Sequence, residues 1–292
     1  MENISQPLET IAISLAISAP AYLRDHHVGG FVVLPAVEAL QTVARSKPAT
    51  WGADPCRQER AVFHHLLGID ARAGEIPALH EHARYADGRC LSRLTTLRSG
   101  RDLRFTRRME HVSVWFTPGE REAAEVEADP PPDPAEAIRP EGPTFTVSES
   151  RLYDELVPFG PAYRNVRGDV LLAETGVSAT VSGGDFPEAV GPLGSPFPLD
   201  AAMHAACAWG QRYRNRVVFP IGFDRREILA PTRSGETYPC RITPLPDEGA
   251  VLRFDIRLYG RDRRSVEVIR GLKMRDIFGG KLTPPAWVRE GA

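Results

Sequence analysis

Cysteine is scarce in this chain of 292 residues, and no two cysteines are spaced as CxxC. The four are Cys56, Cys90, Cys207 and Cys240. Thiols so few and so scattered exclude a disulfide framework and a zinc site built from cysteine pairs. We therefore expect reduced and mostly buried thiols.

An excess of either charge is also missing, because 36 lysines and arginines face 38 acidic residues and the formal net charge is −2. A nucleic-acid-binding protein would usually carry a basic surplus, so we expect no nucleic-acid partner. Apolar residues make up 42% of the chain and charged residues 25%, which is typical of a globular protein.

No apolar run is long enough to cross a bilayer. The most apolar early stretch, residues 11–23, is interrupted by two serines and Pro20. It is also shorter than the roughly 20 residues that a membrane-spanning helix needs. Glu2 and Glu9 stand where a signal peptide would have basic residues. These absences predict a cytoplasmic protein with no membrane span.

A segment rich in acidic residues and proline divides the chain. Residues 120–141 hold eight acidic residues against two arginines, and residues 129–143 hold six prolines. Such a stretch can neither build a helix interior nor donate to a central sheet, so it predicts a stiff linker. We expect an N-terminal unit over residues 1–128, a linker over 129–143 and a C-terminal unit over 144–292.

The two halves carry similar patterns. In the first, apolar residues alternate over residues 11–17, as in a strand, and Pro35 opens an amphipathic helix after a Gly-containing loop. In the second, a strand pattern at residues 178–182 precedes a helix that Pro198 opens and whose alanines suit enclosure by a sheet. Residues 252–274 follow the pattern of an antiparallel hairpin. Together these patterns indicate an α+β fold with an approximate internal duplication.

Two short motifs carry groups suited to acid–base chemistry. His26, Gly30 and Pro35 fit the pattern HxxxGxxxxP. Asp200 and His204 belong to a segment that fits LDxxxH. In a helix His204 lies one turn after Asp200 on the same face, so the two side chains can interact.

A third motif, between the other two, begins at Tyr153 and reads YDELVPFGPAYRNV, with Gly160 and Pro161 at its centre. In this order, the three motifs resemble those of the dehydratase domains of polyketide synthases, over about residues 10–278. Phe159 departs from the family, in which Tyr or His is common at that position. The chain carries no ketosynthase, acyltransferase or carrier motif, which predicts a freestanding enzyme.

The resemblance implies a double-hotdog fold, in which two antiparallel sheets each wrap around one long helix. It also implies that His26 is a catalytic base and Asp200 a catalytic acid, that the two meet across the interface of the halves, and that His204 orients Asp200. The supporting residues would be Gly30, Pro35, Tyr153, Gly160 and Pro161. The implied substrate is a 3-hydroxyacyl thioester on the phosphopantetheine arm of an acyl carrier protein. No other cofactor is implied, and a homodimer is allowed.

Dehydration of such a thioester to the trans-2-enoyl product removes a proton from C2 and expels hydroxide from C3. The first task needs a base with a pKa near neutral, such as histidine. The second needs a proton donor, and a carboxyl group enclosed by apolar side chains stays protonated because burial disfavours its charged form. Since apolar residues flank Asp200 in the sequence, we expect its pKa to be raised.

The thioester carbonyl needs a hydrogen-bond donor where negative charge develops. We expect a backbone N–H near Gly30 to supply it, with help from the N-terminus of the helix that Pro35 opens.

Other interpretations stay open. His26 and Asp200 could serve a double-bond isomerase or a ring-forming cyclase, and a non-catalytic hotdog could bind acyl chains. Asp200 could be a helix-terminal residue favoured by the helix dipole, and His204 a core histidine. For His27 we expect a solvent-facing side chain.

The remaining histidines do not predict a metal site. His64 and His65 fall in a strand-like run over residues 61–70, where neighbouring side chains point to opposite faces. His80 and His82 share a face of a strand, and we expect both to be exposed.

One stretch of the second half is basic. Residues 212–281 hold sixteen lysines and arginines against nine acidic residues. Complementary charge favours the docking of an acidic partner, and acyl carrier proteins are typically acidic.

Overall fold

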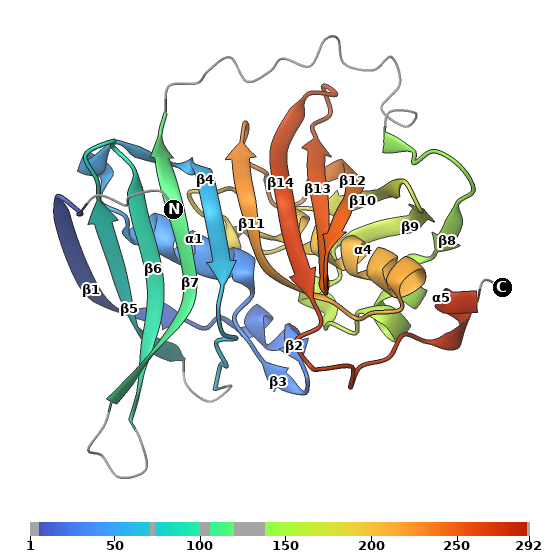
Figure 1. Cartoon of the computed structure of the whole chain (residues 1–292), viewed down its shortest axis with the longest axis horizontal. Coiled ribbons are helices and arrows are strands. Elements are labelled where there is room, and N and C mark those ends of the chain that lie inside the picture. The colour runs from blue at the N-terminus through green and yellow to red at the C-terminus, as the bar shows by residue number, and fades with distance from the viewer. Residues whose placement is uncertain (1–5, 71–73, 100–105, 120–137, 291–292) are drawn as a thin grey trace.

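A computed structural model of the chain describes residues 6–70, 74–99, 106–119 and 138–290 (Figure 1). Residues 129–137 of the predicted linker lie outside this description. No helix among the described residues is long and apolar enough to cross a membrane.

The first half contains one long helix. It comprises β1 (Glu9–Ser18), a 3₁₀ turn (Ala21–Asp25), β2 (His27–Val28), β3 (Phe31–Val32), α1 (Ala36–Ser46), a second 3₁₀ turn (Ala49–Trp51), β4 (Ala53–Phe63), β5 (Glu75–Arg84), β6 (Cys90–Ser99) and β7 (Thr106–Pro118).

The second half contains a longer central helix. It comprises β8 (Phe145–Val147), α3 (Glu149–Arg151), a π-helical turn (Leu152–Leu156), a 3₁₀ turn (Pro161–Tyr163), β9 (Val166–Ala173), β10 (Gly176–Ser182), a 3₁₀ turn (Pro187–Ala189), α4 (Phe197–Arg214), β11 (Phe219–Ile228), β12 (Thr237–Glu248), β13 (Val251–Tyr259), β14 (Ser265–Arg275) and α5 (Ala286–Glu290).

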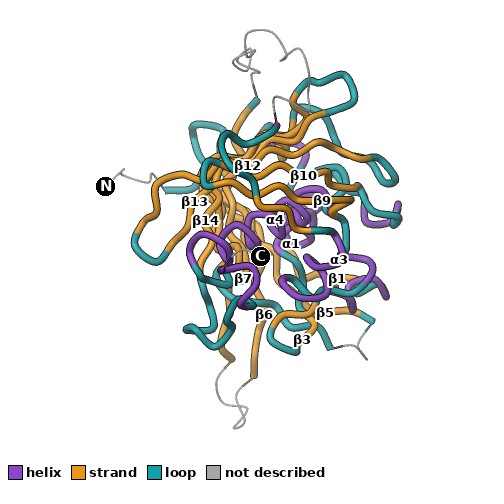
Figure 2. Tube along the Cα trace, turned by 90° about the vertical axis from the view of Figure 1, so that its right-hand side faces the viewer, coloured by secondary structure: helices purple, strands orange, loops and turns teal. Residues whose placement is uncertain are grey.

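In the described part of the chain, twelve strands form one antiparallel sheet in the order β1-β5-β6-β7-β4-β11-β14-β13-β12-β10-β9-β8. The pairing of β4 with β11 joins the two halves, and the predicted hairpin appears as β13 and β14. Figure 2 shows the sheet curving around α1 and α4. The predicted α+β class is therefore confirmed, whereas these twelve strands form one continuous sheet instead of the two separate sheets that were expected, because β4 pairs with β11.

Each half packs its helix against its own strands. Helix α1 contacts β6 and β7, while α4 contacts β9, β10, β12 and β13, and the two helices contact each other. Every residue of α4 from Phe197 to Gln211 is buried, which confirms the enclosed helix that its alanines predicted. Small side chains let strands approach such a helix from several sides.

The side chain of Gln41 fastens α1 to the loop that precedes α4. Its Nε2 donates to the Gly194 carbonyl at 2.6 Å, and its Oε1 accepts the Leu193 N–H at 3.1 Å. The helix of one half thus helps to fix the start of the helix in the other half, which positions Asp200.

Two histidines on β5 are buried, so the expectation of exposed side chains was wrong. His80 and His82 are 1% and 0% exposed because their face of β5 turns toward the C-terminal end of α1. Both imidazoles interact with the Ser46 hydroxyl, at 2.7 and 3.1 Å. Burial lowers the pKa of each from 6.5 to about 4.

These buried histidines should make the protein less stable in mild acid. The unfolded chain takes up protons as pH falls through about 6.5, whereas folded His80 and His82 stay neutral until about pH 4. The free energy of unfolding therefore decreases across that window. His80→Asn retains a polar atom near Nδ1 and removes the titrating ring together with Nε2, which has no hydrogen-bond partner. Denaturant titrations at several pH values should show a shallower decrease for this variant.

The matched control is His27→Asn, because His27 is exposed. It should keep the wild-type pH dependence of unfolding. An unchanged pH dependence in His80→Asn would show that the buried imidazole does not control stability in acid.

Candidate active site

His26 lies between the 3₁₀ turn Ala21–Asp25 and the hairpin β2–β3, and it is buried. Its Nδ1 donates to the Val33 carbonyl at 3.0 Å, which leaves Nε2 as the basic nitrogen. The Phe159 ring stacks on the imidazole at 4.5 Å between ring centroids, and the Tyr163 ring meets it edge-on at 5.0 Å. Backbone and aromatic contacts thus fix both the tautomer and the plane of His26.

The hairpin β2–β3 brings Val33, the residue that follows β3, back to His26. Gly29 and Gly30 have φ of 60° and 83°, the left-handed values that a two-residue turn of this kind requires. Gly30 is exposed at the tip of the hairpin and does not line the cavity described below. Pro35 directly precedes α1, whose first residue, Ala36, does line it.

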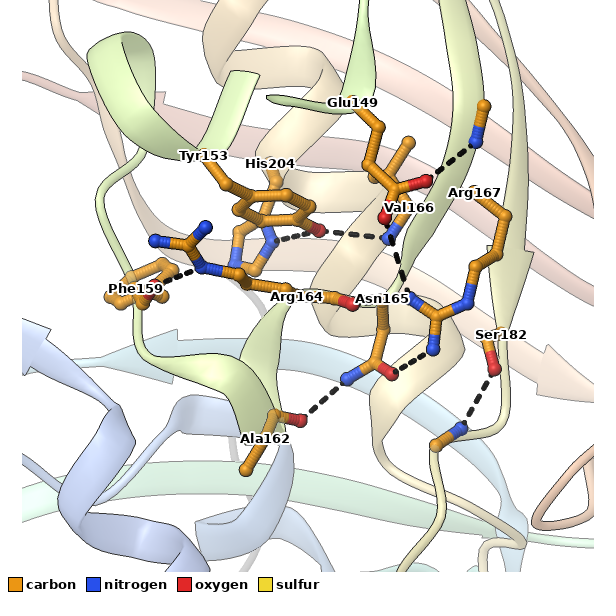
Figure 3. A network of polar contacts seen from close by, with 12 residues as sticks. Glu149, Tyr153, Phe159, Ala162, Arg164, Asn165, Val166, Arg167, Ser182 and His204 are labelled. Atoms are coloured by element: carbon orange, nitrogen blue, oxygen red, sulfur yellow. Dashed lines mark hydrogen bonds and ion pairs between the residues drawn. The ribbon is translucent and has the colours of Figure 1, made fainter. Parts of the chain in front are cut away.

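Asp200 lies in the first turn of α4 and is also buried. Its Oδ2 accepts a hydrogen bond from His204 Nε2 at 3.1 Å, one helical turn further on. Tyr153, from the π-helical turn, has its hydroxyl 3.4 Å from His204 Nδ1 (Figure 3). The same hydroxyl accepts the Val166 N–H at 2.8 Å, so its own proton is free to point at His204. This chain of contacts turns the Nε2–H of His204 toward Asp200.

One cavity brings the two sequence motifs together. It has a volume of about 670 Å³ and is lined by His26 from the first half and by Asp200 and His204 from α4. Most of its remaining wall is apolar, including Leu34, Val157 and Met203. Such a cavity can enclose an acyl chain and exclude water from the polar groups.

His26 and Asp200 affect each other's pKa. Burial lowers the pKa of His26 from 6.5 to about 4, although Asp200 acts in the opposite direction. Burial raises the pKa of Asp200, but His204 and His26 outweigh that effect, so the pKa lies below its ordinary value. The expectation of a raised pKa for Asp200 was therefore wrong, because the carboxyl group faces two imidazoles as well as apolar side chains.

The third motif packs against both His26 and His204. Gly160 precedes the 3₁₀ turn that Pro161 opens, and this turn holds Phe159 and Tyr163 against His26. Phe159 also packs on His204, with ring centroids 4.8 Å apart. A single turn of the second half therefore contacts side chains of both motifs.

Comparison with known families identifies the chain. Residues 130–283 match the sequence model of the polyketide synthase dehydratase N-terminal domain. The chain belongs to the polyketide synthase dehydratase family. A comparison with curated protein sequences finds no match.

Solved dehydratase structures share the fold along nearly the whole chain. The dehydratase domain of a mycocerosic acid synthase-like polyketide synthase is 20% identical, with a TM-score of 0.71, over 92% of this chain and 93% of that one. The dehydratase domain from the CurJ module of curacin polyketide synthase is 16% identical, with a TM-score of 0.71, over 93% of both chains. A bifunctional dehydratase-cyclase domain in ambruticin biosynthesis is 19% identical, with a TM-score of 0.66, over 91% of this chain and 92% of that one. At these identities the likeness shows the fold alone.

Three further histidines of this dehydratase-family protein, His64, His65 and His111, line the cavity and were not assigned to it from the sequence. The expected strand over residues 61–70 ends at Phe63, so His64 and His65 do not alternate on a strand. His64 Nε2 is hydrogen-bonded with the Ser113 hydroxyl at 2.9 Å and lies 3.1 Å from Glu110 Oε1. Among the described residues, no group of three or more His, Cys, Asp and Glu side chains is placed to hold a metal ion.

Proposed function

We propose that the protein dehydrates a 3-hydroxyacyl thioester, carried on an acyl carrier protein, to the trans-2-enoyl thioester and water. The observation that carries this proposal is the meeting of His26 and Asp200, from different halves, in one largely apolar cavity. The reaction needs such a base and such an acid on one substrate, shielded from water.

His26 acts as the base. With a pKa of about 4 it is neutral at physiological pH, so its Nε2 can take the C2 proton without first losing one. The hydrogen bond from Nδ1 to the Val33 carbonyl stabilises the imidazolium that forms.

Asp200 acts as the acid once substrate fills the cavity. Exclusion of water strengthens the effect of burial and favours the neutral carboxyl group. Since His204 occupies Oδ2, the other oxygen, Oδ1, gives its proton to the departing hydroxyl. The C2–H and C3–O bonds break, the C2=C3 bond forms, and one water leaves. Return of the proton from His26 to Asp200 then restores the starting state.

The thioester carbonyl is held by the start of α1. Ala36 lines the cavity in the first turn of this helix, where backbone N–H groups lack intrahelical partners and the helix dipole favours negative charge. The Gly30 hairpin contributes by fixing Val33 and the chain entering α1. We therefore place the carbonyl at α1 rather than at the hairpin tip.

The two halves correspond to two hotdogs. The N-terminal hotdog would span residues 1–128 and the C-terminal hotdog residues 144–292, with a linker over 129–143. In the described residues, each half contributes its own strands and one long helix to the shared sheet. The pairing of β4 with β11 supports a double hotdog with a continuous sheet. The acyl carrier protein brings its phosphopantetheine arm to the cavity, and Arg275 in the cavity wall belongs to the basic stretch 212–281.

Product analysis tests the proposal. A panel of carrier-bound 3-hydroxyacyl chains is incubated with the protein, and the released acyl groups are examined by proton NMR. We expect two vinyl protons at C2 and C3 with a trans coupling. A double bond beyond C3 would instead identify an isomerase. A cyclic ether would identify a cyclase, and the fold shared with a dehydratase-cyclase domain keeps that as the second candidate.

A further inference from the structure

Asp25, which precedes His26 in the chain, connects the two halves. Its carbonyl oxygen accepts the Gly160 N–H at 2.8 Å, and its Oδ2 accepts the Ala162 N–H at 2.8 Å. One residue of the first half thus holds two backbone donors of the turn 159–163 in the second half. A charged acceptor makes the second of these bonds strong.

The close approach explains the glycine at position 160. Gly160 has φ of −70° and ψ of 172°, values that any residue can adopt. A Cβ atom there would lie 2.5 Å from Cγ of Asp25, far inside van der Waals contact. Glycine is therefore needed for proximity to Asp25 rather than for backbone conformation.

The turn that Asp25 holds contacts His26 and His204, the residue that is hydrogen-bonded to Asp200. Phe159 lies at its start, stacked on His26 and packed on His204. Asp25 itself does not line the cavity, so it would act only through this turn. A shift of the turn would change the orientation of His26 relative to Asp200 and admit water beside the imidazole.

We propose that Asp25 is a positioning residue, which locks the turn 159–163 onto the His26 loop and so aligns the proposed base with the proposed acid. The inference rests on the proposed roles of His26 and Asp200. Its structural part, the lock on the turn, can be tested without turnover.

The test compares Asp25→Ala with Asp25→Asn. In Asp25→Ala the acceptor for Ala162 is lost, and kcat should fall about tenfold to a hundredfold with little change in KM, since small misplacements have effects of that size. The pKa of His26, measured by NMR without substrate, should rise from about 4 toward 6.5. Asp25→Asn keeps an acceptor oxygen and should restore both values. Gly160→Ala places a methyl group against Asp25 and should therefore change kcat and the pKa of His26 in the same way as Asp25→Ala.

The matched control is Asp54→Ala. It removes the same kind of bond, from the Cys56 N–H to Asp54 Oδ1 at 2.9 Å, at the start of β4. It should leave kcat and the His26 titration unchanged. The charged groups that shift the pKa of His26 are Asp200, His204 and His27, and no variant changes them.

Two results together would overturn the inference: His26 in Asp25→Ala titrates with the wild-type pKa, and the variant loses activity only in proportion to its unfolded fraction. A wild-type protein that dehydrates no substrate would refute the proposed function instead. The NMR titration would still decide whether Asp25 locks the turn.

Discussion

His26→Ala should lower kcat by at least about a hundredfold, the smaller end of what a general base contributes. The side chain that takes the C2 proton is gone, and the Phe159 and Tyr163 rings that pack on it offer no basic nitrogen. The fold should survive because His26 lies in a connection between short elements rather than in the sheet. Steady-state rates and a thermal melt of each variant check both statements.

His27→Ala is the matched control. The adjacent imidazole is exposed, as expected from the sequence, and should be replaceable without loss of rate. Near-wild-type turnover by a folded His26→Ala variant would remove His26 from the mechanism.

Asp200→Asn should lose most turnover on the 3-hydroxy substrate while still binding it. The amide keeps the size of the carboxyl group and can contact His204, but its N–H protons are not acidic enough to be transferred to the departing hydroxyl. The loss should shrink for a substrate with fluoride at C3, because that leaving group needs no protonation. Single-turnover rates on the two substrates measure the difference.

Met203→Leu provides a control at the same helix and cavity, since it conserves volume and carries no proton. It should change the two rates alike. If Asp200→Asn dehydrates the hydroxy substrate well, Asp200 is a helix-terminal residue, and the acid must be sought first at His204.

The sequence predicted the elements of the fold because they follow from local patterns. Alternation marked β1 and the hairpin β13–β14, and the alanines of α4 marked a helix enclosed by strands. Short motifs also predicted that His26 and Asp200 belong together, and the structure places both in one cavity.

The features that the sequence did not predict depend on contacts between residues that are far apart in the chain. Burial raises the pKa of Asp200, but two imidazoles, one of which comes from the other half of the chain, together lower it by more. The burial of His80 and His82 depends on where α1 ends over β5. The hydrogen bonds between Asp25 and the turn 159–163 form because the two halves approach closely at Gly160.

The most direct test of the central claim, that His26 and Asp200 act together in one dehydration, is the mass of a carrier-bound 3-hydroxyacyl chain after incubation. With the wild-type protein the mass should fall by one water. With His26→Ala and with Asp200→Asn it should stay unchanged over the same time. A wild-type protein that binds the loaded carrier and leaves its mass unchanged would contradict the account and favour a non-catalytic acyl-binding protein.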